Sequence, residues 1–255
     1  MRLCLIDNNQ TVCEVWRRWL DGVGDVKVWR GGLEAVAAWD CGVTRGVVSP
    51  GNSLGYLRGG FDLGLRELLG GAMFEDWVRG QLGRSYRPLG AVRGAARARA
   101  VLCGAACGTY GTCRRMVAQT APGVRRCKAR WRQACNPVFD AVWGVLQALP
   151  AEVEELLLPG IGTGYAGIPA SIAAVSMAFA IRLHLVREQL SAELVAVMIM
   201  CFLGCQYEPF MPEHCRREYV SLGLPWERLL SFDVLQDSLD EILPRALRRP
   251  AVGNT

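Results

Sequence analysis

Two segments of the sequence join a short apolar run to a glycine-rich turn and then to the start of a helix. The first covers residues 47–62 and reads V-V-S-P-G-N-S-L-G-Y-L-R-G-G-F-D, and the second covers residues 157–169 and reads L-L-P-G-I-G-T-G-Y-A-G-I-P. In a parallel sheet such turns lie at the carboxyl ends of the strands, where ligands bind. Glycines let the main chain approach a ligand closely, and the following helix N-terminus favours a phosphate group. The two segments therefore predict an α/β fold with a phosphate-binding edge.

The rest of the chain alternates β-branched runs with helical patterns, which is typical of a layered α/β domain. Asp7, Asn8 and Asn9 offer side-chain caps for the first helix. Pro169 suits the first turn of the helix after the second loop, and Pro137 predicts a kink in the helix before it. The expected strands cover residues 2–6, 26–29, 45–49, 89–101, 114–119, 154–158 and 194–202, and the expected helices cover residues 11–20, 33–39, 61–83, 126–149, 169–190 and 226–247.

Composition narrows the class of protein. The chain is 51% hydrophobic and 21% charged, which argues against a disordered or collagen-like protein. No uninterrupted apolar stretch reaches the roughly 18–20 residues that a membrane span needs, and no secretory signal is recognisable. We therefore expect a soluble cytoplasmic or nuclear protein with no membrane partner. Its eleven cysteines are expected to be reduced, many of them as small buried hydrophobic residues.

The charges are unevenly distributed along the chain. Residues 79–132 carry 13 positive charges, and no acidic residue lies between Asp76 and Asp140. The remainder has 29 − 13 = 16 basic and 24 acidic residues, a net charge of −8. A segregated basic segment suggests an anionic partner, which could be RNA or DNA, a phosphorylated ligand or an acidic protein. A solvated arginine surface produced by codon bias explains the same pattern equally well.

The second loop also contains G-x-G-x-x-G, the pattern of dinucleotide-binding folds, at Gly162, Gly164 and Gly167. That pattern normally opens directly into a helix and is followed by an acidic residue about 20 positions later. Here Pro169 delays the helix, and residues 177–187 contain no carboxylate. We therefore do not favour a dinucleotide-binding fold.

Both loops resemble those of the macro domain family. The first is similar to N-A-A-N-x-x-L-x-G-G-G-G-V-D, with the same ten-residue spacing from Asn52 to Asp62, and Ser49 to Ser53 look closest to a divergent S-P-A-N-S branch. The second is in register with P-A-I-S-T-G-I-Y-G-Y-P over eleven positions without a gap. The resemblance runs over residues 1–205 and implies a three-layer α/β/α sandwich with a mixed, mostly parallel sheet. Residues 206–255 are then expected to form a C-terminal helical extension packed on the same domain.

The resemblance implies that the chain binds ADP-ribose, free or attached to a protein or nucleic acid, without a further cofactor or metal. Asn52 would contact the distal ribose. Asp62, together with Asn52, would be catalytic if the chain is an ADP-ribosyl glycohydrolase, because Asp62 matches the residue that orients the attacking water. The other implied ligand contacts are Asp7, Gly59, Gly60 and Phe61 before or in the first loop, and Gly160, Gly162, Thr163, Gly164 and Tyr165 in the second.

Several positions depart from the family pattern. The family reads the adenine amine with the Asp of a G-D-[IV] motif, whereas this chain has Gly32 there, so Asp7 or Glu34 would have to supply the acceptor. Arg58 replaces a small residue and would either clamp a phosphate or fill the cleft. Ala166 replaces an aromatic residue. These departures leave open a degenerate macro-like module that binds nucleic acid or an acidic protein through its basic segment.

Each functional interpretation has a purely structural alternative. Asn52 could structure its loop, Asp62 could cap its helix, and the second-loop glycines could simply make a tight turn. His184 is expected in the core or partly buried, and Phe202 and Tyr207 either in the core or stacked on a base. A zinc site is the less favoured interpretation of the spacing of Cys201, Cys205, His214 and Cys215.

Overall fold

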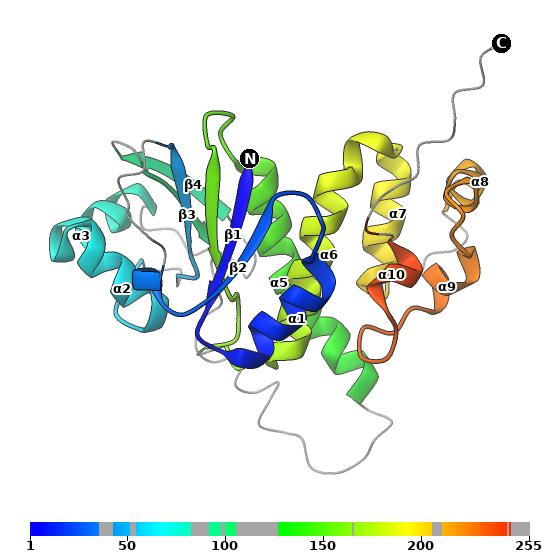
Figure 1. Ribbon diagram of the computed structural model, residues 1–255, viewed down its shortest axis with the longest axis horizontal. Coiled ribbons are helices and arrows are strands. Elements are labelled where there is room, and N and C mark those ends of the chain that lie inside the picture. Colours follow the sequence, from blue (N-terminus) through cyan, green and yellow to red (C-terminus); the bar gives the residue numbers. More distant parts are fainter. Residues whose placement is uncertain are drawn as a thin grey trace.

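A six-stranded sheet with the strand order β2-β1-β6-β3-β5-β4 forms the centre of the protein (Figure 1). The computed structural model describes residues 1–35, 43–51, 55–82, 92–97, 100–105, 127–164, 166–205, 211–243 and 245, and for residues 92–97, 100–105 and 127–136 it describes the main chain only. The strands are β1 (Arg2–Asp7), β2 (Val26–Arg30), β3 (Arg45–Ser49), β4 (Val92–Arg97), β5 (Ala100–Ala105) and β6 (Glu155–Pro159). All neighbouring pairs are parallel except β4 and β5. The expected mixed, mostly parallel sheet is confirmed.

Helices cover both faces of this sheet. The helices are α1 (Gln10–Leu20), η1 (Leu33–Ala35), α2 (Gly60–Leu69), α3 (Gly71–Leu82), α5 (Cys127–Ala148), α6 (Ala170–Val186), η2 (Arg187–Gln189), α7 (Ala192–Phe202), α8 (Glu213–Ser221), α9 (Trp226–Ser231) and α10 (Leu239–Ile242). Alternate strand residues point to opposite faces, so Leu3 and Leu5 pack with α1, α5 and α6 while Cys4 and Ile6 pack with α2 and α3. The three-layer α/β/α arrangement is confirmed (Figure 1).

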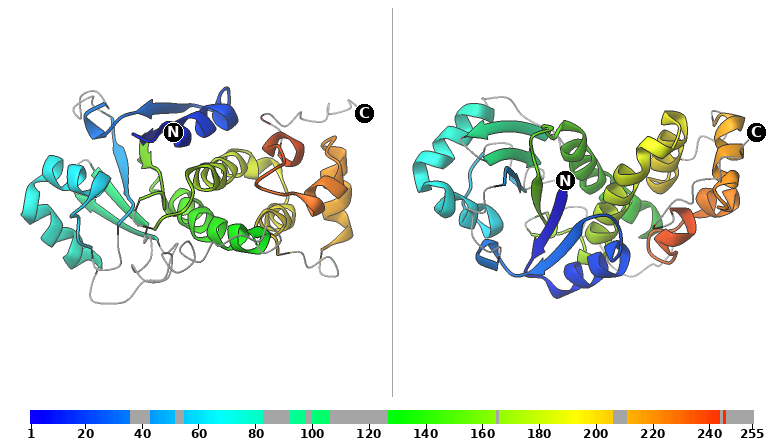
Figure 2. Two further views of the ribbon diagram at one scale, coloured as in Figure 1. Left: turned by 90° about the horizontal axis from the view of Figure 1, so that it is seen from below. Right: turned by 45° about the horizontal axis from the view of Figure 1, so that its top comes forward.

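Helix α6 is the centre of the larger core. Together with η2 it is the one described segment, Ala170–Gln189, that is long and apolar enough to cross a membrane, and 67% of it is buried inside the fold. Its one fully buried charge, Arg182, donates to Leu243 O and lies 2.8 Å from Asp240. The contacts of α6 are therefore those of a core helix. Helices α7 to α10 lie beyond it, on the side away from the sheet (Figure 2).

Two sequence predictions about this region are wrong. The expected strand at residues 194–202 is the helix α7, which Ser191 caps by accepting from Leu194 N. A short continuous apolar run has no periodicity that separates a buried strand from a buried helix. The expected helix at residues 226–247 is two short helices, α9 and α10, and α8 was not anticipated.

The middle of the chain also differs from expectation. The expected strand at residues 89–101 is divided between β4 and β5, which form an antiparallel pair. The other expected strand, at residues 114–119, lies outside the described residues. The expected long helix is α5, which includes Pro137, and the kink at that residue stays a prediction.

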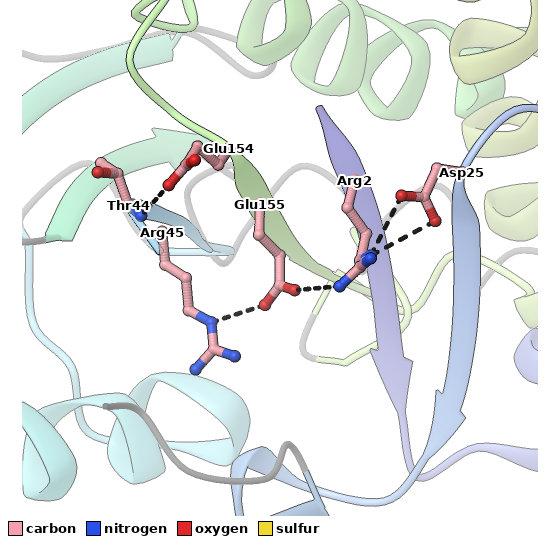
Figure 3. A network of polar contacts seen from close by, with 6 residues as sticks. All are labelled: Arg2, Asp25, Thr44, Arg45, Glu154 and Glu155. Atoms are coloured by element: carbon pink, nitrogen blue, oxygen red, sulfur yellow. Dashed lines mark hydrogen bonds and ion pairs between the residues drawn. The ribbon is translucent and has the colours of Figure 1, made fainter. Parts of the chain in front are cut away.

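The amino ends of four strands are tied together by a chain of charges, shown in Figure 3. Asp25, Arg2, Glu155 and Arg45 follow one another in the order of strands β2, β1, β6 and β3, with N–O distances of 3.2, 3.6 and 2.6 Å. Glu154 is beside them and accepts from Thr44 N at 2.8 Å. This network joins the strands at the edge opposite to the glycine loops.

Candidate functional site

Both glycine loops lie at the same edge of the sheet. Strands β3 and β6 are parallel neighbours, with Val47 opposite Leu157, so the loops that follow them leave the sheet side by side. Strand β1 is parallel to β6 on its other side and ends at Asp7. The carboxyl ends of three adjacent strands therefore bring Asp7 and both loops together, in the arrangement that α/β proteins use for binding.

The second loop is a tight turn that needs glycine at two positions. Gly162 has a φ of 82°, and a Cβ there would lie 2.7 Å from Ile168 Cδ1. Ile168 N donates to Gly162 O, and Gly167 N donates to Gly164 O, each at 3.0 Å. None of the hydrogen bonds among the described residues uses the amides of Gly162, Thr163 or Gly164. These three amides therefore have no main-chain or side-chain partner among the described residues; Gly162 is buried, Thr163 is partly buried and Gly164 is exposed.

Asp7 attaches the second loop to β1. Its Oδ1 accepts from Asn9 N at 2.7 Å, and the amides of Asn8 and Gly160 also donate to the carboxylate. Burial raises the pKa of Asp7, and these amide hydrogen bonds lower it in part. A Cβ at Gly160 would collide with Asp7 Oδ2. The absence of a side chain at Gly160 is what lets the carboxylate reach the loop amide.

The first loop leads into an uncapped helix. Gly59 is the N-cap residue of α2, which has no side-chain capping hydrogen bond, and Gly60 has a φ of 53° that disfavours other residues. Phe61 packs against the core between the sheet and α2. The helix N-terminus beside the loop is left to attract negative charge. Asn52 in this loop and Tyr165 in the second loop lie outside the described residues.

Asp62 is a buried carboxyl in the first turn of α2. It is 7% exposed, and Ser49 Oγ at the end of β3 donates to its Oδ1 at 2.7 Å. Burial raises the pKa of Asp62 to about 6, against the smaller opposing effect of the Ser49 hydrogen bond. Such a group changes its charge near neutral pH, as acid–base residues do. Ser49 is not among the site residues predicted from the sequence. The signal that could have identified it is its position as a polar residue at the end of an apolar strand.

Glu34 occupies the space that a side chain at position 32 would fill. Gly32 N donates to Glu34 Oε1 at 3.1 Å, and a Cβ at Gly32 would lie 2.6 Å from the same oxygen. Gly31 N donates to Asp7 O at 3.0 Å, which holds this turn against the end of β1. The exposed carboxylate of Glu34 thus lies near Asp7, at the binding edge.

The side chain of Arg58 is 69% exposed and contacts two neighbouring residues. Its guanidinium stacks on Tyr56 at 4.3 Å and lies 3.5 Å from the buried carboxylate of Glu75 on α3. Glu75 also accepts from Leu57 N at 2.9 Å, and Arg79 stacks on Tyr56 at 4.5 Å. These contacts fix the segment before Gly59 onto α3.

Other candidate residues are placed in the core. Phe202 stacks on Phe179 with ring centroids 4.0 Å apart and is buried, so its core interpretation is confirmed, while Tyr207 lies outside the described residues. His184 is half-buried against Trp143, and burial lowers its pKa to about 4. Within the described ranges, no three His, Cys, Asp or Glu side chains are grouped closely enough to hold a metal ion.

Comparison with known proteins gives a family match and a similarity to solved structures. The family model described as a macro-like domain matches residues 27–249. A solved structure described as a protein of unknown function from Bacteroides thetaiotaomicron is similar to this chain, with 18% identity, a TM-score of 0.41, and coverage of 64% of this chain and 92% of the other. The division into a domain over residues 1–205 and an extension over 206–255 stays a prediction, because the family match crosses that boundary.

Proposed function

The chain belongs to the macro-like domain family, and from that premise we propose that it binds ADP-ribose, free or attached to a target, at the edge formed by its two glycine loops. The observation that carries the proposal is that no hydrogen bond among the described residues uses the amides of Gly162, Thr163 and Gly164, in a loop that leaves the sheet next to the loop before the uncapped N-terminus of α2. Main-chain amides and a helix N-terminus are suited to a diphosphate. Gly59, Gly60 and Phe61 would line the other side of the same ligand, with Asn52 and Tyr165 completing the contacts.

Glu34 is the better of the two candidate acceptors for the adenine amine. The carboxylate of Asp7 already accepts from three main-chain amides, whereas Glu34 accepts from Gly32 N and is exposed. Each carboxylate oxygen has two lone-pair sites, so Glu34 can still accept from a ligand. Asp7 would then hold the second loop rather than read the base.

Hydrolysis of the ADP-ribosyl linkage is the second candidate, favoured by the burial of Asp62 beside the first loop. An ionised Asp62 could orient or deprotonate a water next to the anomeric carbon, with Asn52 contacting the ribose. Its pKa of about 6 leaves it mostly ionised at pH 7. Release of free ADP-ribose from a mono-ADP-ribosylated protein, lost in Asp62→Asn, is the measurement for this step.

The binding proposal is tested by calorimetry with ADP-ribose and a pair of glycine variants. A Cβ at Gly164 meets no atom within 4 Å, so Gly164→Val should fold normally but keep the diphosphate away from the loop amides. Gly80 on α3 also has open space for a Cβ, and Gly80→Val is the matched control. We expect at least a roughly tenfold loss of affinity in Gly164→Val and none in the control, since one lost charge-assisted hydrogen bond exceeds 1.4 kcal/mol.

Two results would refute ADP-ribose binding. One is the absence of heat with the wild-type protein at millimolar ligand. The other is equal affinity of wild type and Gly164→Val. If the wild type instead binds RNA or DNA with an affinity that falls steeply with salt, and Asp62→Asn leaves that affinity intact, a module acting through residues 79–132 becomes the better account.

A further inference from the structure

Ser49 is a buried polar residue at the end of an otherwise apolar strand. Every residue of β3 is buried, and Ser49 is 3% exposed. A buried hydroxyl needs a hydrogen-bond partner, and the partner of Ser49 is Asp62, thirteen residues later on α2. The contact therefore joins the sheet directly to the first turn of the helix that follows the first loop.

The two oxygens of the Asp62 carboxylate have different surroundings. Oδ1 accepts from Ser49 Oγ at 2.7 Å. Oδ2 is the oxygen nearer to the first loop, because a Cβ placed on Gly51 would lie 3.8 Å from it and 3.1 Å from Ser49 Oγ. Gly51 thus leaves space next to both groups. One oxygen is held by the strand, and the other is directed to the turn that leads to Asn52.

The Ser49 hydroxyl is also the side-chain group that favours the ionised form of Asp62. In the part of the chain that the structure describes, no ion pair reaches this carboxylate, and the first turn of α2 supplies only the helix dipole. A hydroxyl that donates to a carboxylate stabilises the charge without neutralising it.

We propose that Ser49 is a positioning residue for Asp62, holding Oδ1 so that Oδ2 faces the first loop as an ionised acceptor for the bound ligand or for a water beside it. The proposal rests on the proposed function for the identity of the ligand. It assigns Ser49 no contact with that ligand. Its effect is exerted through the orientation and charge of Asp62.

The test is the titration of Asp62 in the free protein, followed by NMR of 13C-labelled aspartate carboxyls and assigned by the loss of one signal in Asp62→Asn. Burial has already raised the pKa of Asp62 to about 6. Ser49→Ala removes the hydrogen bond that opposes this rise, so the midpoint should move upward by at least about one pH unit. Ser49→Thr keeps the hydroxyl and should keep the wild-type midpoint.

Ser49→Cys fills nearly the same volume with a weaker donor and serves if Ser49→Ala does not fold. Its midpoint should lie above that of the wild type. An unchanged midpoint in the folded Ala or Cys variant overturns the proposal, as does a Thr variant that shifts as far as Ala. None of these measurements needs a ligand. Failure of ADP-ribose to bind would therefore refute the proposed function without affecting the test of Ser49 and Asp62.

A second experiment, with ligand present, connects the titration of Asp62 to ADP-ribose binding. If the wild type binds ADP-ribose, the pH at which affinity or hydrolysis reaches half its maximum should move upward in Ser49→Ala by the same amount as the Asp62 midpoint. Affinity that is merely reduced at every pH, with no movement of the profile, would mean that Ser49 supports the loop structurally and does not act through the charge of Asp62.

Discussion

Replacing Glu155 by Gln removes the central negative charge of the network that ties the amino ends of the strands (Figure 3). The side chains of Glu155 and Arg45 are each 8% exposed, and Glu155 Oε1 lies 2.6 Å from Arg45 Nε. Glu155 also lies 3.6 Å from Arg2. The variant keeps the shape of the side chain but leaves the buried guanidinium of Arg45 without its facing carboxylate.

The expected loss follows from the burial of both partners. Removing one partner of a buried ion pair typically lowers the free energy of unfolding by about 3–5 kcal/mol, because the remaining charge is left in a poorly solvated place. For a chain of this size roughly 2–4 °C of melting temperature corresponds to each kcal/mol. We expect Glu155→Gln to melt roughly 6–20 °C below the wild type.

Glu154 provides a matched control one residue away. Its side chain is exposed and accepts from Thr44 N at 2.8 Å, a bond that the amide oxygen of Gln can also make. Glu154→Gln should therefore change the free energy of unfolding by less than about 0.5 kcal/mol. Both variants are measured by urea denaturation monitored by tryptophan fluorescence and by thermal melting in the same buffer.

A double variant distinguishes charge from packing. Removing Arg45 as well, in Arg45→Met with Glu155→Gln, eliminates the buried charge that faced Glu155 and should recover part of the lost stability. If Glu155→Gln and Glu154→Gln cost the same small amount, the network contributes nothing measurable, and the register of the strands is set by apolar packing. The site is at the opposite edge, so folded Glu155→Gln should bind ADP-ribose as the wild type does.

Three further predictions concern other charges. Asp240→Asn should lower the free energy of unfolding by about 2 kcal/mol, because Asp240 is the counter-ion of buried Arg182 but is itself 43% exposed. Arg182→Met should lower it by less, and denaturation curves showing the reverse order would refute this. Asp62, with a pKa raised to about 6, stabilises the fold below its unfolded pKa and loses this contribution as pH rises through 6, so Asp62→Asn should be more stable than the wild type by about 2 kcal/mol at pH 7 and equal near pH 4. Glu34→Gln should reduce roughly tenfold the preference for ADP-ribose over its inosine analogue in competition binding, because an amide can donate to the hypoxanthine oxygen.

The parts of the fold that the sequence predicted are those where local pattern and burial agree. The strands at residues 26–29 and 45–49 lie within one residue of β2 and β3, and Asn9 caps α1 by accepting from Val12 N at 3.3 Å. Both loops could be recognised because tight turns demand glycine locally. The position of both loops at one edge of the sheet follows from the parallel direction of the strands, which the alternation of strands and helices also predicts.

The parts that could not be predicted depend on contacts between distant residues. Nothing in an eleven-residue apolar run reveals that α7 packs on α6 rather than pairing in the sheet. The bond from Ser49 to Asp62 needs the distance between strand and helix, which no sequence spacing provides. The hydrogen bond from Gly32 N to Glu34 depends on the turn after β2, which folds the carboxylate back onto that amide.

The two edges of the sheet use carboxylates in different ways, and this difference supports the proposed site at the carboxyl edge. At the amino edge Glu155 and Asp25 face guanidinium groups, so the charges of both signs are matched within the chain. At the carboxyl edge Asp7 and Glu34 accept from main-chain amides, and the guanidinium of Arg58 in the first loop lies against Tyr56 and Glu75. The amides of residues 162–164 are left as the donors there. Because carboxylates accept from amides at the ends of β1 and β2, they hold these turns without using the amides of residues 162–164, which are the donors that a phosphate needs.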